Sequence, residues 1–395
     1  MRKAVGVWVV VAEVLSLAPT ARAVAQGRGP QPVSPSKVVS IGPANATIDE
    51  EFARLISVRE LSNGRVILAD DKEKRLVAVD FVAKTARTLG RAGEGPQEYR
   101  EVGRLWDVGG DSTFMSVPYA RRWLLLHRDS IVSTFTGQLP VILKVGSTII
   151  RGADAHGNVL GLAPLVRVPD QPFVMPDSFT FVRTNRTSLK VDTVFRTINS
   201  DKNIVVRNAA ARGTAAPPPE QRRYSISLKA RDQAAMFPDG AIAVLRGMPF
   251  RVDWCLVAGR PCSQGAPLER GARALSDADK LAYLKAMNAL GAWPPTENVD
   301  QTLGWPEKMP SFATPGGADE ANFWAAPSGN VVVERLPNAR TPLFTYDVVN
   351  RGGLLVARVS VPPGHRVLGF GAKSVYIIRV DDDDIQHLQR HAWSY

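Results

Sequence analysis

Residues 52–99 read FARLISVRELSNGRVILADDKEKRLVAVDFVAKTARTLGRAGEGPQEY, and this stretch decides the fold. The dipeptide Asn63-Gly64 is a strong hairpin signal because both residues tolerate a positive φ. Short runs of alternating or β-branched residues lie around it, at 56–61, 65–69, 75–80 and 84–89. Four short antiparallel strands in about 45 residues have the size of one β-propeller blade.

The tight turn of this first unit recurs along the chain. A hydrophobic residue enters each copy, a short β-rich run follows it, and the copies end at Gly64, Asp111, Asn158, Gly240, Gly329 and Lys373. Successive turn ends lie 47, 47, 82, 89 and 44 residues apart, and the three short intervals agree with one repeated unit. We therefore predict an all-β fold over residues 38–395, a six-bladed β-propeller of four-stranded antiparallel blades.

The first long interval is explained by a loop. Residues 199–221 include three consecutive prolines. Proline cannot donate to a sheet ladder, so this stretch predicts a Pro-rich loop insertion rather than an extra blade.

The second long interval is explained by a helix over about residues 276–291. Ser276 precedes Asp279 by three positions, which is the spacing of a capping box, and a glycine ends the segment. One face of this predicted helical insertion carries Leu281, Leu284 and Met287.

The last repeat lacks an outer strand, because too little chain follows its second strand to supply two more. Residues 38–41, ahead of the first blade, read Val-Val-Ser-Ile and can provide it. Closing the ring removes exposed sheet edges, which a secreted sheet protein must manage. We predict that residues 38–41 pair in the last blade.

The N-terminal residues have the pattern of a secretory leader. Two basic residues precede an apolar run over residues 4–17, and Ala23 and Ala25 offer cleavage sites. A membrane anchor is the alternative, but Glu13 interrupts the run, which is shorter than the roughly 20 residues of a span. The pattern predicts a periplasmic or secreted protein without a stable membrane span after cleavage, with a signal peptide at 1–25 and a tether at 26–37.

The composition is basic, with a formal net charge of +11 at pH 7. The excess is scattered arginine without a basic run or a basic amphipathic helix, which argues against a nucleic-acid partner. A small anionic ligand, or an envelope protein or polysaccharide, is the easier partner, and an arginine-rich surface without a partner is the alternative. We expect a monomer.

The two cysteines, Cys255 and Cys262, lie seven residues apart. A reversing turn between them can bring their Cα atoms within disulfide range, and export favours oxidation. We predict a structural disulfide; two free thiols or a metal pair are the alternatives.

At residues 90–99 the chain resembles a known family. The sequence Gly-Arg-Ala-Gly-Glu-Gly-Pro-Gln-Glu-Tyr is similar to the Gly-x-x-Gly-x-Gly-Pro-Gly-Glu-Phe linker of NHL-like six-bladed propellers exported by bacteria, with Gln97 and Tyr99 in place of Gly and Phe. Residues 305–312 and the tail from Gly369 also look like that group's pattern. The resemblance implies an exported propeller, with lactone- and sugar-processing enzymes as distant relatives.

Known catalytic and metal-binding patterns are missing from the sequence. The glycines of residues 90–95 are misplaced for a phosphate loop. Four consecutive acids at 381–384 would alternate between the faces of a strand, which favours a solvated edge over a calcium site. His387 and His391 would share a helical face but lack a third ligand. We predict no metal site, no cofactor and no catalytic residue; calcium enters only under the enzyme alternative below.

One positional pattern points to the central channel. Seven residues before each turn end stands a polar residue, namely Ser57, Arg104, Arg151, Gln233, Asn322 and Arg366. The next residue is never polar, and neighbours in a strand face opposite sides. By the usual blade order this is the innermost strand, so the pattern predicts a polar ring whose three arginines attract an anion. The structural alternative is that these side chains hydrogen-bond between blades.

We therefore expect an exported binding protein that engages a small anionic ligand or an envelope partner through its channel or loops. The alternative is a lactonase- or lyase-like enzyme that uses the channel and can depend on calcium. The candidate carboxylates of such an enzyme are Asp107, Asp154 and Glu320. A purely structural platform that functions through its outer loops, such as 199–221, is a third reading.

Overall fold

The computed structural model describes residues 38–117, 122–136, 150–163, 178–198, 224–225, 228, 231–256, 260–269, 273–291, 302–303, 305–312 and 322–395. The predicted leader, tether and Pro-rich insertion, and the candidate Glu320, lie outside these residues.

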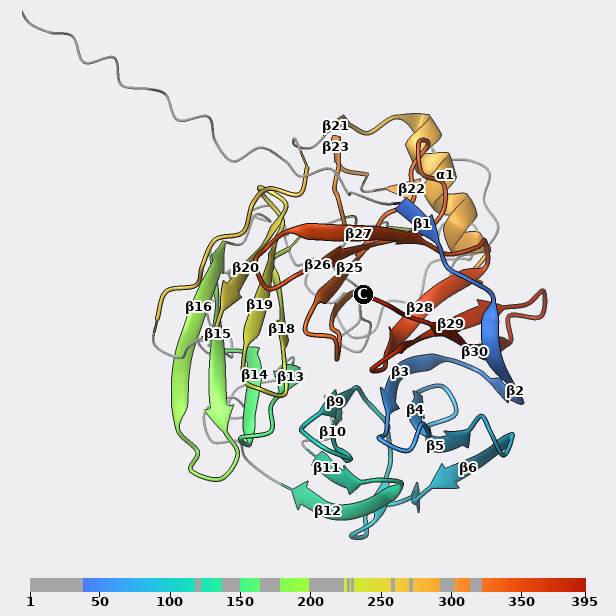
Figure 1. The fold of residues 1–395 in the computed structure, drawn as a ribbon, viewed down its shortest axis with the longest axis vertical. Helices are drawn as coiled ribbons and strands as arrows, with labels where there is room; N and C mark the ends of the chain where they lie inside the picture. Colours follow the sequence, from blue (N-terminus) through green and yellow to red (C-terminus); the bar gives the residue numbers. More distant parts are fainter. Residues whose placement is uncertain are drawn as a thin grey trace, which may run out of the picture.

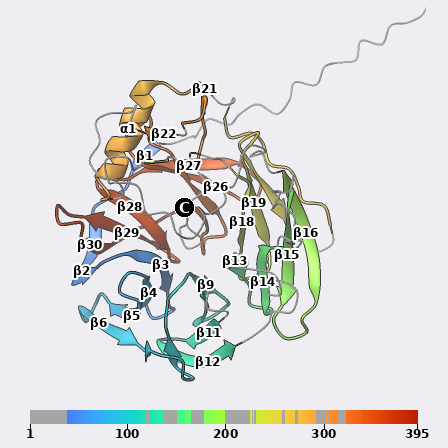
Figure 2. The same cartoon turned by 180° about the vertical axis from the view of Figure 1, so that it is seen from behind.

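The described chain forms six antiparallel sheets around a central axis, which Figures 1 and 2 show from opposite sides. The first blade contains β3 (Leu55–Glu60), β4 (Val66–Asp70), β5 (Arg75–Asp80) and β6 (Thr85–Leu89). The second contains β9 (Leu105–Asp107), β10 (Ser112–Val117), β11 (Arg122–His127) and β12 (Ser130–Thr136). The third contains β13 (Ile150–Ala153), β14 (Asn158–Leu162), β15 (Ser178–Asn185) and β16 (Val191–Ile198). The last three are β18 (Gln233–Met236), β19 (Ile242–Arg246) and β20 (Arg251–Cys255); β24 (Phe323–Ala325), β25 (Val331–Arg335), β26 (Thr345–Val349) and β27 (Leu355–Ser360); and β28 (His365–Phe370), β29 (Ser374–Val380) and β30 (Gln386–Ala392).

The six-bladed propeller predicted from the turn repeat is confirmed. The four strands of the first blade begin and end within one residue of the predicted runs. The strand that precedes each repeated turn is the innermost one, and consecutive innermost strands contact one another from β28 through β3, β9, β13 and β18 to β24.

The core lies between blades, because both faces of each sheet pack against neighbouring sheets. Every position of β4 is buried, whereas the outer strand β6 is mostly exposed. Near the axis the blades converge until a side chain no longer fits. A Cβ on Gly369 would lie 2.7 Å from Cγ1 of Val58 in the next blade, so glycine is needed at this close approach.

The ring is closed by a different N-terminal segment from the one predicted. The outer strand of the last blade is β2 (Ala44–Phe52), which pairs antiparallel with β30 and buries Ile48 and Phe52. The predicted strand forms β1 (Val38–Ser40), but it adds in parallel to the outer strand of the fifth blade. Closure by the N-terminus is therefore confirmed, and the assignment of residues 38–41 to the last blade is wrong.

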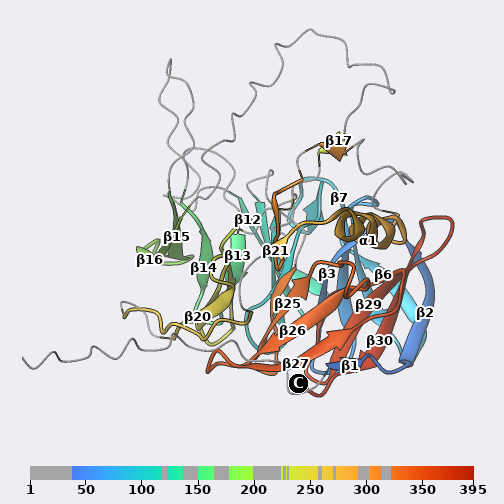
Figure 3. The same ribbon diagram turned by 90° about the horizontal axis from the view of Figure 1, so that it is seen from above.

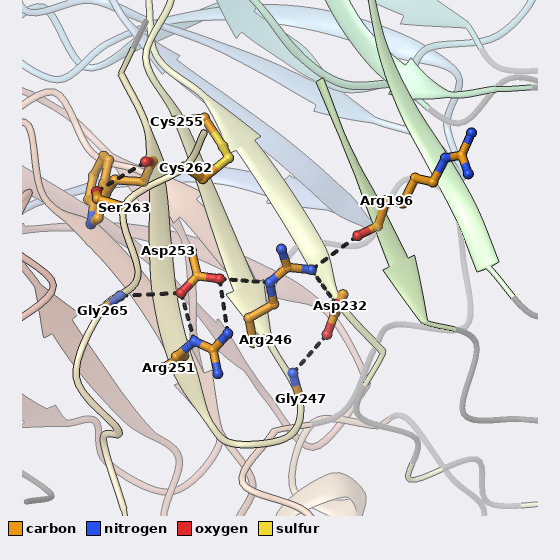
Figure 4. Close-up of polar contacts among 11 residues, drawn as sticks. Arg196, Asp232, Arg246, Gly247, Arg251, Asp253, Cys255, Cys262, Ser263 and Gly265 are labelled. Carbon is orange, nitrogen blue, oxygen red and sulfur yellow. Dashed lines mark hydrogen bonds and ion pairs between the residues drawn. A yellow bond between two sulfur atoms is a disulfide. The ribbon is translucent and has the colours of Figure 1, made fainter. Parts of the chain in front are cut away.

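The fourth blade has three described strands and a bridged segment in place of a fourth. Trp254 and Ser263 exchange two backbone hydrogen bonds of 2.9 and 2.7 Å. A disulfide joins Cys255 and Cys262 next to this bridge, with a Cα–Cα distance of 4.2 Å (Figure 4). The cross-link therefore holds the outer segment against β20 where a regular strand ladder is missing from the described residues.

The insertion before the fifth blade contains the predicted helix, α1 (Asp277–Asn288). Ser276 and Asp279 form the capping box, as expected. Tyr283 and Leu284 are buried, whereas Leu281 is 45% exposed, so the predicted face is wrong at that position. In Figure 3, where the ring is seen from its rim, α1 lies towards one face and the C-terminal end of the chain at the other.

Short strand pairs form small sheets separate from those of the blades. β7 (Arg91–Ala92) pairs with β8 (Glu98–Tyr99), β17 (Tyr224–Ser225) with β22 (Thr302–Leu303), and β21 (Arg273–Ala274) with β23 (Lys308–Met309). The last of these pairs leads into α1.

Candidate functional site

The family-like linker at residues 90–99 has a structural role. The hydroxyl of Tyr99 donates to the carbonyl of Leu89 at 2.5 Å and accepts the amide of Leu76 at 2.9 Å. Burial raises the pKa of this hydroxyl. Gly93 has a φ of 153°, a backbone conformation that residues with a side chain rarely adopt, which explains the glycine in the motif. The linker fastens the first blade to the second and has no phosphate-binding geometry.

Two of the six predicted ring residues, Ser57 and Arg104, line the cavity at the axis, and the other four are not among its lining residues. Ser57, Gln233 and Asn322 are buried, and Ser57 Oγ accepts the amide of Leu105 in the next blade at 3.1 Å. The faces of a blade point to its neighbours, so a polar side chain on the innermost strand can also meet another blade. Arg151 is half-buried near the start of β13.

Arg366 shows this most clearly. Its Nε and Nη2 donate to the two carboxylate oxygens of Glu334 in the fifth blade at 2.9 and 2.8 Å. The hydroxyl of Tyr346 donates to the same carboxylate and accepts the amide of Val367. Arg366 therefore hydrogen-bonds between two blades, as predicted by the structural alternative to the polar ring.

Arg366 shares this arrangement with several other arginines of the described residues. Each guanidinium lies over an aromatic ring of the preceding blade and also pairs with one or more carboxylates. Examples are Arg246 over Phe195 at 5.5 Å, Arg335 over Phe250 at 5.1 Å, and Arg366 over Phe344 at 5.7 Å from the ring centroid. Such contacts are strongest when the cation is partly shielded from water. Some of the arginines that make the chain basic therefore join neighbouring blades.

Figure 4 shows the junction around Asp253. Its carboxylate accepts hydrogen bonds from Nε of Arg246 at 2.9 Å, Nε of Arg251 at 2.7 Å and the amide of Gly265 at 3.2 Å. Burial acts to raise the pKa of Asp253, but the hydrogen bonds from Arg251 and Arg246 lower it below its ordinary value. The ionised carboxylate therefore holds the outer segment of the fourth blade.

The carboxylates proposed for an enzyme are engaged in similar structural contacts. Asp107 pairs with Arg59 at 2.9 Å and accepts the amide of Gly109. Asp154 is 1% exposed and accepts the amides of His156 and Asn158, so it organises its turn. Within the described residues, no group of three metal-ligating side chains occurs.

The acid run is a turn rather than the predicted strand. It links β29 to β30, and the Asp381 carboxylate accepts the amides of Asp383 and Ile385. His387 pairs with Asp381 at 2.6 Å, and His391 contacts the carbonyl of Gly42. Both histidines lie on β30, so the expected helical face is also wrong.

A cavity of about 100 Å³ lies at the axis. All six blades contribute to its wall, through Ser57, Trp106, Ala153, Met236, Trp324 and Phe370. Of the six predicted ring residues, Ser57 and Arg104 line it. The residue two positions after each predicted ring position also lines the cavity in all six blades, namely Arg59, Trp106, Ala153, Ala235, Trp324 and Leu368, so the same alignment shifted by two residues would have found this wall.

The described residues that line the cavity include two arginines and one aspartate. Arg59, Arg104 and Asp107 are its charged lining residues. Arg59 and Asp107 neutralise each other across the first two blades. The guanidinium of Arg104 lies 4.5 Å from the ring centroid of Trp106, which is also in the wall. The wall thus combines guanidinium groups with aromatic and apolar side chains, which together can contact a small organic anion.

Comparison with known proteins identifies structural neighbours of very low sequence identity. Calcium-binding regucalcin from Agrobacterium tumefaciens is 8% identical, with 91% of this chain and 98% of that chain covered and a TM-score of 0.43. A DUF4221 family member from Bacteroides vulgatus is 10% identical, with coverage of 89% and 96% and a TM-score of 0.47. Streptogramin B lyase is 8% identical, with coverage of 88% and 86% and a TM-score of 0.39.

These neighbours say nothing about the activity or ligand of this chain. No family model matches it, and no curated protein is similar in sequence. The NHL-like resemblance thus stays a prediction beyond the six-bladed fold. Among the described residues, the structure has no helix that is long and apolar enough to span a membrane.

Proposed function

We propose that this protein is an exported binding protein that takes a small organic anion into the axial cavity. The observation that carries the proposal is the position of the Arg104 guanidinium, which lies over the ring of Trp106 in a cavity wall built largely from apolar side chains. A charge-assisted hydrogen bond to a carboxylate is strongest where water is excluded. The leader-like N-terminus supports export, and the proposal calls for no cofactor.

The proposal assigns different roles to the three arginines first grouped by position. Arg104 contacts the ligand, whereas Arg366 holds Glu334 at a blade junction. Arg151 has no role in it. An envelope protein or polysaccharide as partner is the less specific version of the same function.

Calorimetric titration with matched small molecules tests the proposal. We expect sodium benzoate or propionate to bind, and benzamide, propionamide and benzylamine not to bind at the same ionic strength. Arg104→Gln should weaken carboxylate binding about tenfold or more, because a charge-assisted contact contributes about 1.5–3 kcal/mol. Arg87→Gln is the matched control, since Arg87 is 62% exposed on the outer strand of the first blade.

Two results would contradict the proposal. Equal binding of carboxylates and their amides would show that charge plays no part. Full affinity in folded Arg104→Gln protein would place the anion elsewhere.

A further inference from the structure

The residues that follow β30, Trp393 to Tyr395, leave the sixth blade and run towards the propeller axis. The amide of Trp393 donates to the carbonyl of Lys373 at 2.9 Å, and Lys373 lies in the hairpin between β28 and β29. In Figures 1 and 2, which view the ring from opposite sides, the C-terminal end lies inside the ring of innermost strands. Figure 3 places it at the face opposite α1. Residues 393–395 are called the tail below.

The axial cavity lies at the end of the innermost strands that the tail crosses. Asp107 and Phe370, which line the cavity, are the last residues of β9 and β28. Pro238 and Pro327, which also line it, lie in the hairpins that follow β18 and β24. The tail crosses the corresponding hairpin of the sixth blade. The tail and the cavity therefore share one face of the propeller.

A continuous row of aromatic rings connects the cavity wall to the tail. Trp324 and Phe370 both line the cavity and meet edge to face, with centroids 5.8 Å apart. The ring of Phe370 lies 4.9 Å from that of Trp393, which in turn lies 5.2 Å from that of Tyr395. The tail therefore packs directly behind a side chain of the wall, and a movement of the tail changes the surroundings of Phe370.

The docked tail combines a favourable and an unfavourable feature. The ring of Trp393 is its anchor, because Trp393 is 6% exposed whereas Ser394 is exposed and Tyr395 is half-buried. The indole nitrogen of Trp393, however, is buried without a hydrogen-bond partner among the described residues. A buried donor without a partner costs free energy, which is recovered when the donor reaches water. Release of the tail therefore regains part of the free energy that the ring loses on exposure.

We propose that the tail is a gate of the axial cavity. When docked, it covers the hairpin end of the cavity and holds Phe370 in the wall; when released, it leaves that end open to a ligand. Only molecules with a released tail admit the ligand, and an open population of about 10% or less lowers the rate of entry and the apparent affinity about tenfold or more. The inference rests on the proposed function, because it assumes that the cavity is the binding site.

Cysteine labelling tests the gate without a ligand. Ala325 lines the cavity, so the labelling rate of Ala325→Cys shows how readily a small methanethiosulfonate reagent reaches it. The native cysteines are bonded to each other and stay unlabelled. We expect labelling to be about tenfold or more faster in a chain that ends at Ala392 than in the full chain. Val82→Cys is the control, because Val82 is 90% exposed and should be labelled equally fast in both chains.

A second variant covers the case in which the shortened chain folds poorly. Tyr395→Ala removes the half-buried ring at the end of the tail and keeps the buried Trp393. It should also accelerate the labelling of Ala325→Cys, with an unchanged melting temperature as the check on folding. Labelling in both variants at the rate of the full chain would overturn the gate. A rise at Val82→Cys as large as at Ala325→Cys would overturn it too, because the tail would then stabilise the fold in general.

Titration with benzoate separates this inference from the proposed function. If both hold, the chain that ends at Ala392 binds benzoate about tenfold or more tightly than the full chain. Faster labelling of Ala325→Cys without any benzoate binding would support the gate and contradict the proposed function. Benzoate binding that does not change when the tail is removed would overturn the gate and leave the proposed function intact.

Discussion

The guanidinium of Arg366 in the sixth blade donates two hydrogen bonds, of 2.9 and 2.8 Å, to the carboxylate of Glu334 in the fifth blade. The Glu334 side chain is only 5% exposed. A buried ion pair of this kind is important for stability, because removing one member leaves the charge of the other buried without a partner.

Arg366→Gln should therefore destabilise the protein by about 3–5 kcal/mol. Urea unfolding at neutral pH measures the change as a lower midpoint. Arg87→Gln is the control, because its exposed pair with Asp129 contributes about 1 kcal/mol or less. A midpoint shift for Arg366→Gln no larger than that of the control would show that the junction is not important.

Acid should weaken the attachment of α1. The hydrogen bonds from Arg273 hold the pKa of Asp279 well below its ordinary value. A carboxylate with a depressed folded pKa contributes stability that is present above its unfolded pKa of about 3.9 and is lost as the pH falls below it.

Asp279→Asn should consequently cost stability at pH 7, and its difference from the wild type should shrink at pH 3. Below the unfolded pKa the gap closes by about 1.4 kcal/mol for each pH unit. Urea midpoints of both proteins from pH 7 to pH 3 measure this. A difference that stays constant over that range would contradict the ion pair.

The disulfide should stabilise mainly the outer segment of the fourth blade. The loop closed by Cys255 and Cys262 is short, so reduction should cost about 2–3 kcal/mol. Hydrogen exchange at the amides of Trp254 and Ser263 should accelerate first, because these residues form the bridge beside the cross-link. Two free thiols in protein purified from the envelope would rule the bond out.

The two N-terminal strands should differ in importance. A chain that begins at Gly42 lacks β1 and should lose little stability, whereas one that begins at Ala53 also lacks β2 with its buried Ile48 and Phe52. Loss of Phe52 alone removes a contact of about 3–5 kcal/mol. Thermal melting compares the two chains, and equal melting temperatures would contradict closure by β2.

The architecture could be predicted because each blade carries its own local signal. The turn at Asn63-Gly64 places Gly64 at a φ of 81°, a conformation that glycine adopts readily, and three later turns repeat it at Gly157, Gly240 and Gly329 with φ values of 82°, 86° and 88°. The strand β2 has no such signal. Its sequence, ANATIDEEF, is rich in polar residues, and it becomes a strand only by pairing with β30 at the other end of the chain.

The candidate site could be predicted only in part for a related reason. Alternation showed correctly that Ser57 and Arg366 share one face of their strands, but it could not show which partner that face meets. Ser57 meets the amide of Leu105, and Arg366 meets Glu334. The cavity wall uses the residue two positions later in each repeat, from Arg59 to Leu368, so the alignment indicated the right strand but the wrong position on it.

A crystal structure of the protein with bound benzoate tests the central claim most directly. The account predicts density for benzoate in the axial cavity, with its carboxylate within hydrogen-bond distance of Arg104. Benzoate found only outside the axial cavity, or inside it with its carboxylate turned away from Arg104, would contradict the account.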